Sequence, residues 1–73
     1  MEEKKDIKLV QLGERIREMR ITKEMTLSEL ADRSSCASNY IAMLERGERN
    51  PTYLTLLKIA SGLGVKMGEL VKE

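Results

Sequence analysis

The residue types that carry most enzyme and metal chemistry are scarce in this sequence. It contains no histidine, and Cys36 is its single cysteine. Neither a Cys–His nucleophile pair nor an ordinary zinc or haem site can therefore be assembled. No glycine-rich phosphate loop is recognisable, and Gly62, Gly64 and Gly68 are expected to form caps and turns. We predict that the protein is not an enzyme and holds no cofactor or metal.

Charge and hydropathy narrow the class of protein further. The first six residues mix acids and lysines with no apolar stretch behind them, and no run approaches the roughly 18 to 20 apolar residues of a membrane span. Together with the lone cysteine, this predicts a cytoplasmic protein with no membrane partner. The net charge of +1 indicates only modest non-specific attraction to nucleic acid, because that attraction comes from neutralising phosphates.

The polar and basic side chains need a scaffold, and the sequence predicts an all-α one in a single domain over residues 1–73. Without Phe or Trp and with one Pro, the composition favours packed helices over a β-sandwich. The predicted helices span residues 7–23, about 27–33, about 38–46, 52 to about 62–64, and a last turn or two within 65–71. The fourth helix, which is largely apolar, is expected to be the most buried.

Two local signals support the first helices. Apolar residues recur at three-and-four spacing in the first, at Leu9, Leu12, Ile16 and Met19. Thr26 followed by Glu29 has the spacing of a capping box, which marks the start of the second helix. The second and third helices, joined by about four residues, form a predicted helix-turn-helix over about residues 27–46. That geometry suits DNA, but it is also a common structural unit.

Four segments together resemble the Cro and phage-repressor helix-turn-helix family over roughly residues 9–71. They are residues 12–20 (LGERIREMR), 26–31 (TLSELA), 40–51 (YIAMLERGERNP) and 56–65 (LLKIASGLGV). Within them, residues 45–50 are most similar to the controller proteins of restriction-modification operons. The resemblance implies a compact five-helix, lambda-repressor-like fold and a sequence-specific DNA-binding transcription regulator.

The resemblance also implies that the third helix is the recognition helix in the major groove. Asn39 could bond adenine through two hydrogen bonds, Ser38 could bond either base edge, and Ala42 or Met43 could contact a thymine methyl. The alternatives are that Met43 fills the core and that Ser38 only caps the helix. The predicted base contacts are Ala37, Ser38, Asn39, Ala42 and Met43.

Other matched positions imply contacts with the DNA backbone, which fix register without reading sequence. The predicted backbone contacts are Thr26, Leu27, Tyr40, Arg46, Arg49 and Asn50; the alternative for the last three is a solvated loop. Arg20 and Glu45 match a partly buried, bidentate ion pair behind the recognition helix. Their predicted role is structural, although Arg20 could also reach a phosphate.

Four positions depart from the family pattern. Leu27 replaces the usual glutamine, which removes a polar contact with DNA. Ser35 replaces the turn glycine and must adopt a left-handed conformation. Cys36 replaces an apolar residue and is interpreted as a small buried hydrophobe rather than a redox sensor. Ala37 replaces a polar cap and could itself face DNA. The target sequence therefore cannot be carried over.

One recognition helix reads only a few base pairs, so a homodimer on two half-sites roughly 34 Å apart is expected. The predicted dimer face comprises apolar residues that could equally be core: Tyr53, Leu54, Val65, Met67, Leu70 and Val71. The expected partners are double-stranded DNA, a second copy of the chain and, for an activator, RNA polymerase. No small-molecule ligand is expected.

Two rival functions use the same motifs. An antitoxin would repress its own operon through a helix-turn-helix and also hold a toxin protein, but the chain has little beyond the predicted bundle for that purpose. A structural adaptor between proteins would leave the placement of the arginines and asparagines unexplained.

Overall fold

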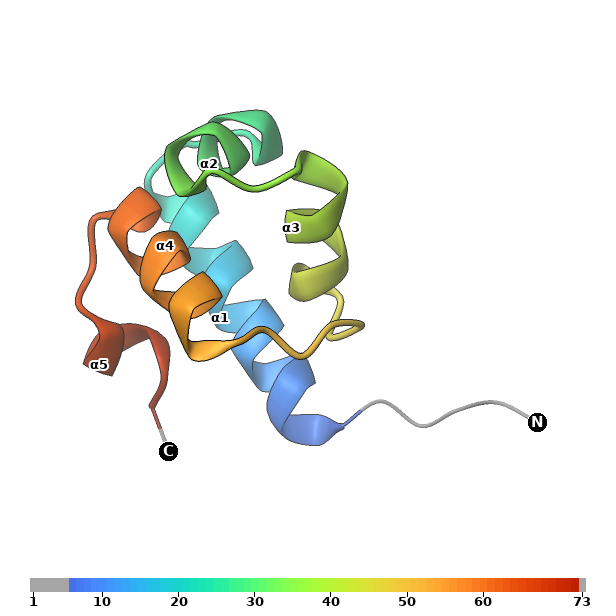
Figure 1. The fold of residues 1–73 in the computed structure, drawn as a ribbon. Coiled ribbons are helices and arrows are strands. Elements are labelled where there is room, and N and C mark those ends of the chain that lie inside the picture. Colours follow the sequence, from blue (N-terminus) through green and yellow to red (C-terminus); the bar gives the residue numbers. More distant parts are fainter. Residues whose placement is uncertain (1–5, 73) are drawn as a thin grey trace.

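The computed structural model describes residues 6–72, and its regular elements are all helices (Figure 1). They are α1 (Ile7–Thr22), α2 (Leu27–Ser34), α3 (Ser38–Glu45), α4 (Tyr53–Leu63) and α5 (Met67–Leu70). The all-α, five-helix prediction is thus confirmed, and the first three helices end within a residue of their predicted ends. No helix in this part of the chain combines the length and apolar character needed to cross a membrane.

Every helix contributes to one hydrophobic core. α2 packs on α4, α1 packs on α3, and the short α5 docks against α4 and α1 (Figure 1). The largest apolar side chains with almost no exposed surface are Ile16, Leu30, Ile41, Leu44, Ile59, Leu63 and Leu70. Burying each aliphatic side chain of this size contributes about 1.5–3 kcal/mol, so a core of aliphatic residues can hold such short helices together.

Leu70 belongs to this core and not to the molecular surface. Its exposed fraction is 0%, and the Arg15 Nη1 donates a hydrogen bond of 2.8 Å to the Leu70 carbonyl oxygen. The sequence left open whether Leu70 is a dimer contact or a core residue, and its burial favours the core, because α5 turns this side chain inward against the bundle.

α4 is buried over only half of its length. Ile59, Ala60 and Leu63 lie in the core, whereas Tyr53 and Leu54 in the first turn are 65% and 68% exposed. The prediction that this helix is the most buried thus holds for its C-terminal half alone. An apolar sequence does not by itself show which turns another helix will cover.

α1 to α4 are each followed by a residue in the left-handed conformation. The residues are Glu24, Ser35, Gly47 and Gly64, with φ of 56°, 54°, 76° and 73°. In this geometry the next backbone N–H groups bond back to carbonyls of the last helical turn. Two of the four ends use a residue other than glycine, and Glu24 has no sequence signal that predicts it.

A glycine permits the close approach of α1 to the end of α3. A Cβ atom on Gly13 would overlap the carbonyl oxygen of Leu44 and lie 2.7 Å from the carbonyl oxygen of Glu45. Backbone atoms cannot rotate away as a side chain can. Gly13 therefore fixes how closely the C-terminal end of α3 sits against α1.

Gly13→Ala should lower the free energy of unfolding by about 2 kcal/mol, because the added methyl forces α1 away from α3. The control is Gly68→Ala in α5, where an added Cβ meets nothing within 4 Å. That change should raise stability by about 0.5–1 kcal/mol through helix propensity. Urea unfolding followed by circular dichroism measures both, and equal stabilisation by the two variants would contradict the close-approach argument.

Candidate nucleic-acid interface

Ser35 turns the chain between α2 and α3. With φ 54° and ψ 42° it is left-handed, as predicted. Its N–H bonds the Asp32 carbonyl oxygen at 3.3 Å, and the Cys36 N–H bonds the Ala31 carbonyl oxygen at 2.9 Å. These bonds compensate for the roughly 1–2 kcal/mol that a left-handed conformation costs a residue with a Cβ atom. The turn sets α3 across α2.

Cys36 anchors the turn to the core. Its side chain is half-buried against the hydrophobic cluster, and its Sγ donates to the Ser34 carbonyl oxygen at 3.3 Å. This environment agrees with the interpretation of Cys36 as a small hydrophobe with a weak donor.

α3 has one buried face and one outward face. Ile41 and Leu44 are fully buried, which anchors the inner face. On the outer side, Ala37, Ser38 and Asn39 are exposed, while Ala42 and Met43 are half-buried. Within α3, Ser38 and Asn39 lie one turn before Ala42 and Met43, so these four residues share one face of the helix. The structure therefore brings the five predicted base contacts together on one surface.

The alternatives for two of these residues are weakened. The N-cap of α3 is Ala37, and it makes no side-chain capping bond, so Ser38 does not serve as the cap. Met43 is not among the partly buried side chains packed against the core cluster. Both side chains are therefore available at the surface that faces away from the core.

The predicted DNA-backbone contacts at the start of α2 differ in the groups that they could present to a phosphate. Thr26 and Glu29 form the predicted capping box. The Glu29 N–H donates to the Thr26 hydroxyl oxygen at 3.0 Å, and the Thr26 N–H donates to a Glu29 carboxylate oxygen at 2.8 Å. The Thr26 N–H and hydroxyl lower the pKa of the Glu29 carboxyl. Leu27 and Tyr40 are half-buried and pack against the core. A phosphate at Leu27 would thus meet the backbone N–H rather than the side chain.

Arg46, Arg49 and Asn50 follow α3 and are exposed. Arg46 is ion-paired: its Nε and Nη2 donate to the two carboxylate oxygens of Glu48, both at 3.1 Å. The hydrogen bond to Glu48 and, to a lesser extent, the negative charge of Glu48 raise the pKa of the Arg46 guanidinium. The Arg46–Glu48 ion pair was not predicted from the sequence. The one feature that could have indicated it is an acidic residue two positions after an arginine at the end of a predicted helix.

Arg20 connects α1, the following turn and α3. Its Nε and Nη2 donate to Glu45 at 2.7 and 3.1 Å, and its Nη1 donates to the Met25 carbonyl oxygen at 2.9 Å. The two side chains are only 13% and 6% exposed. The hydrogen bond to Glu45 raises the pKa of Arg20 and outweighs desolvation. The predicted bidentate pair is present, and with the bond to Met25 it engages Nε, Nη1 and Nη2 of Arg20 in contacts within the protein.

The predicted dimer residues are divided between surface and core. Tyr53, Leu54 and Val71 are at least 38% exposed, whereas Val65 and Met67 are half-buried against the core. Leu57 is also 38% exposed and was not predicted. Its signal was its position, three and four residues after Leu54 and Tyr53, which puts it on the same side of α4.

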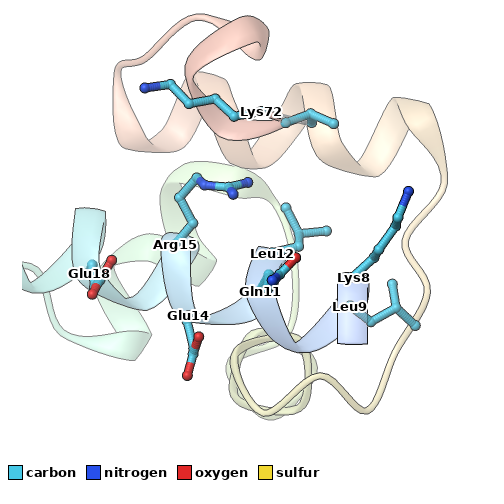
Figure 2. Close-up of a pocket in the computed structure, with 9 residues that line it drawn as sticks. Lys8, Leu9, Gln11, Leu12, Glu14, Arg15, Glu18 and Lys72 are labelled. Carbon is cyan, nitrogen blue, oxygen red and sulfur yellow. The ribbon is translucent and has the colours of Figure 1, made fainter. Parts of the chain in front are cut away.

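A groove of about 640 Å³ lies between α1 and the C-terminal segment (Figure 2). Leu9, Leu12 and Val71 supply apolar lining, and Arg15 and Lys72 lie among them. Acids and bases are mixed along it, and α3 contributes nothing to its lining. Among residues 6–72, no group of three or more potential metal ligands is found.

Comparisons with known proteins give matches over most of the chain. A family model described as helix-turn-helix matches residues 16–70. An uncharacterized helix-turn-helix-type transcriptional regulator of Sinorhizobium fredii is 42% identical over 60 residues, 82% of this chain and 78% of that protein. The immunity repressor of Bacillus phage phi105 is 32% identical over 62 residues, 85% of this chain and 43% of that protein.

A solved structure is similar at nearly full length. The restriction-modification controller protein C.AhdI of Aeromonas hydrophila superposes with a TM-score of 0.87 and 35% identity, over 89% of this chain and 98% of that one. By contrast, this chain spans less than half the length of the phage repressor. The matched proteins thus include one of about this chain's length and one that is considerably longer.

Glu45→Gln should lower the free energy of unfolding by about 2 kcal/mol, because Arg20 would keep its charge in a largely buried position without an anionic partner. The control is Glu48→Gln, which removes the exposed partner of Arg46 and should leave stability almost unchanged. Urea unfolding at low and high salt compares them. Equal losses would contradict a structural role specific to the Arg20–Glu45 pair.

Proposed function

Because the chain belongs to the helix-turn-helix family of the Cro and phage-repressor type, whose members regulate transcription by binding DNA, we propose that it reads an inverted-repeat operator as a homodimer. The observation that carries this proposal is the outward face of α3, where the predicted base contacts lie together beside exposed arginines. The family consists of regulators and not of enzymes, in agreement with the sequence prediction.

α3 would supply the sequence readout. Asn39 carries both a donor and an acceptor on an exposed amide, which is the arrangement that recognises adenine in the major groove. Ser38 beside it can donate or accept, and the methyl groups of Ala42 and Met43 suit a thymine methyl. The buried face of α3 holds the helix in place, so that little conformational freedom of the backbone is lost on binding.

The segment after α3 and the first turn of α2 would hold the DNA backbone. Arg46, Arg49 and Asn50 are exposed at the end of the recognition helix, where they could contact phosphates on one side of the groove. The backbone N–H groups at the start of α2 favour anions because of the helix dipole. These contacts would fix the register in which Asn39 meets a base.

Dimerisation would come from the exposed apolar residues on α4 and the C-terminal segment. Tyr53, Leu54, Leu57 and Val71 together expose apolar surface that nothing in residues 6–72 covers. A two-fold axis through such a patch would repeat α3 at a second half-site. Contact with RNA polymerase would then depend on where the operator lies relative to a promoter.

The proposed biological role is that of a controller protein of a restriction-modification operon. Its support is the likeness to C.AhdI, which extends over 98% of that protein's length. The phage immunity repressor also matches, but this chain spans only 43% of it. The likeness in fold and sequence to a controller protein over 89% of this chain is the reason for preferring that role.

The operator and the role of Asn39 are tested by selecting bound sequences from a random duplex pool. We expect an inverted repeat with half-sites about one DNA turn apart, and Asn39→Ala should relax one position in each half-site at a cost of about 1–3 kcal/mol. The matched control, Asn50→Ala, should weaken all sequences alike. A wild-type selection without sequence preference would overturn the proposed function.

The dimer face is tested with Leu54→Glu, which places a charge on a side chain that is 68% exposed. The monomer should fold normally, while the dimer should dissociate at micromolar concentrations because the charge would be desolvated at the interface. Ile21→Glu on α1, at 48% exposed, is the control and should remain dimeric. Analytical ultracentrifugation reads both; an unchanged association constant for Leu54→Glu would place the dimer face elsewhere.

A further inference from the structure

The first cation after the recognition helix is already paired with an anion. Arg46 presents its Nε and Nη2 to the two oxygens of Glu48 in a bidentate contact, both bonds 3.1 Å long. The same edge of a guanidinium makes the fork-like contact with two phosphate oxygens. The carboxylate thus occupies a surface of Arg46 that a DNA phosphate would use.

The position of Glu48 follows from the backbone and not from a chance side-chain rotamer. Gly47 is left-handed, with φ 76°, and the Glu48 N–H bonds back to the Met43 carbonyl oxygen at 2.9 Å. A Cβ on Gly47 would come within 2.9 Å of the Val10 Cα, so α1 holds this turn in place. The turn returns Glu48 to the end of α3, next to Arg46.

The Arg46–Glu48 pair is exposed enough for another anion to replace Glu48. Its side chains are 55% and 37% exposed, in contrast to 13% and 6% for Arg20 and Glu45. Exposed ion pairs are weak and screened by salt. A phosphate could therefore displace the Glu48 carboxylate from Arg46, whereas the Arg20–Glu45 ion pair would stay intact.

We propose that Glu48 competes with the DNA phosphate for Arg46 and so restrains the affinity for the DNA backbone. The inference rests on the proposed function, since it requires DNA as the ligand. On binding, Arg46 exchanges the Glu48 carboxylate for a phosphate, and the negative charge of Glu48 stays next to the DNA backbone. That charge cancels part of the counterion release that normally drives association, so the contact adds little to the salt dependence of binding.

The experiment measures dissociation constants for the selected operator and for a non-specific duplex, over a series of salt concentrations. Four proteins form a double-mutant cycle: wild type, Glu48→Gln, Arg46→Gln and the double variant. Glu18→Gln removes the same charge from the part of α1 that faces the C-terminal segment, and it is the matched control for net charge. Circular dichroism checks that each variant is folded.

Glu48→Gln should bind both duplexes about two- to fivefold more tightly than Glu18→Gln at low salt, the range expected for an exposed ion pair. Its plot of log K against log salt should steepen by up to about 0.9, the contribution of one phosphate contact. In the Arg46→Gln background, Glu48→Gln should have only the effect of Glu18→Gln. That dependence on Arg46 distinguishes competition from a change in overall charge.

Three results would overturn the inference while leaving the proposed function standing. Glu48→Gln could match Glu18→Gln, it could retain its full effect without Arg46, or it could weaken binding, which would make Glu48 a residue that orients Arg46. Failure of the proposed function looks different, because the wild-type protein would then show no preference for any selected sequence. Absence of binding to every duplex would overturn both.

Discussion

The orientation of α3 depends on how its C-terminal end is clamped to α1. Gly13 allows the backbones of α1 and α3 to approach closely. Arg20 donates two hydrogen bonds to Glu45 and a third to the Met25 carbonyl oxygen in the turn after α1. α3 has only 8 residues, and a helix of so few turns is not stable alone. Its direction is therefore set by its neighbours, and the face it shows to solvent is a consequence of α1.

The other end of α3 is set by the turn at Ser35. There the chain tolerates a left-handed residue with a side chain because the backbone bonds at Asp32 and Ala31 and the half-buried Cys36 hold it. Local strain is maintained where surrounding contacts over-determine the backbone. The clamp at Glu45 and the turn at Ser35 together fix both ends of α3, so its outward side chains share one rigid platform.

Much of the fold follows from signals within a few residues of one another. The spacing of Leu12 and Ile16, and the capping pair Thr26 and Glu29, predicted two helices that the structure contains. Burial across helices was harder: Leu70 is core and Tyr53 is surface, because exposure depends on which helix covers a turn. The Arg46–Glu48 pair was also missed, since its geometry depends on the left-handed Gly47 between them.

The charge balance of the molecule connects these local features to regulation. With a net charge of +1 and Arg46 engaged by Glu48, one copy would gain little from phosphates alone, and the base contacts of a single α3 cover only a few pairs. Tight binding would then require two linked copies, whose second contact is made at high effective concentration. In the proposed function, occupancy of the operator would therefore rise steeply with the protein's own concentration.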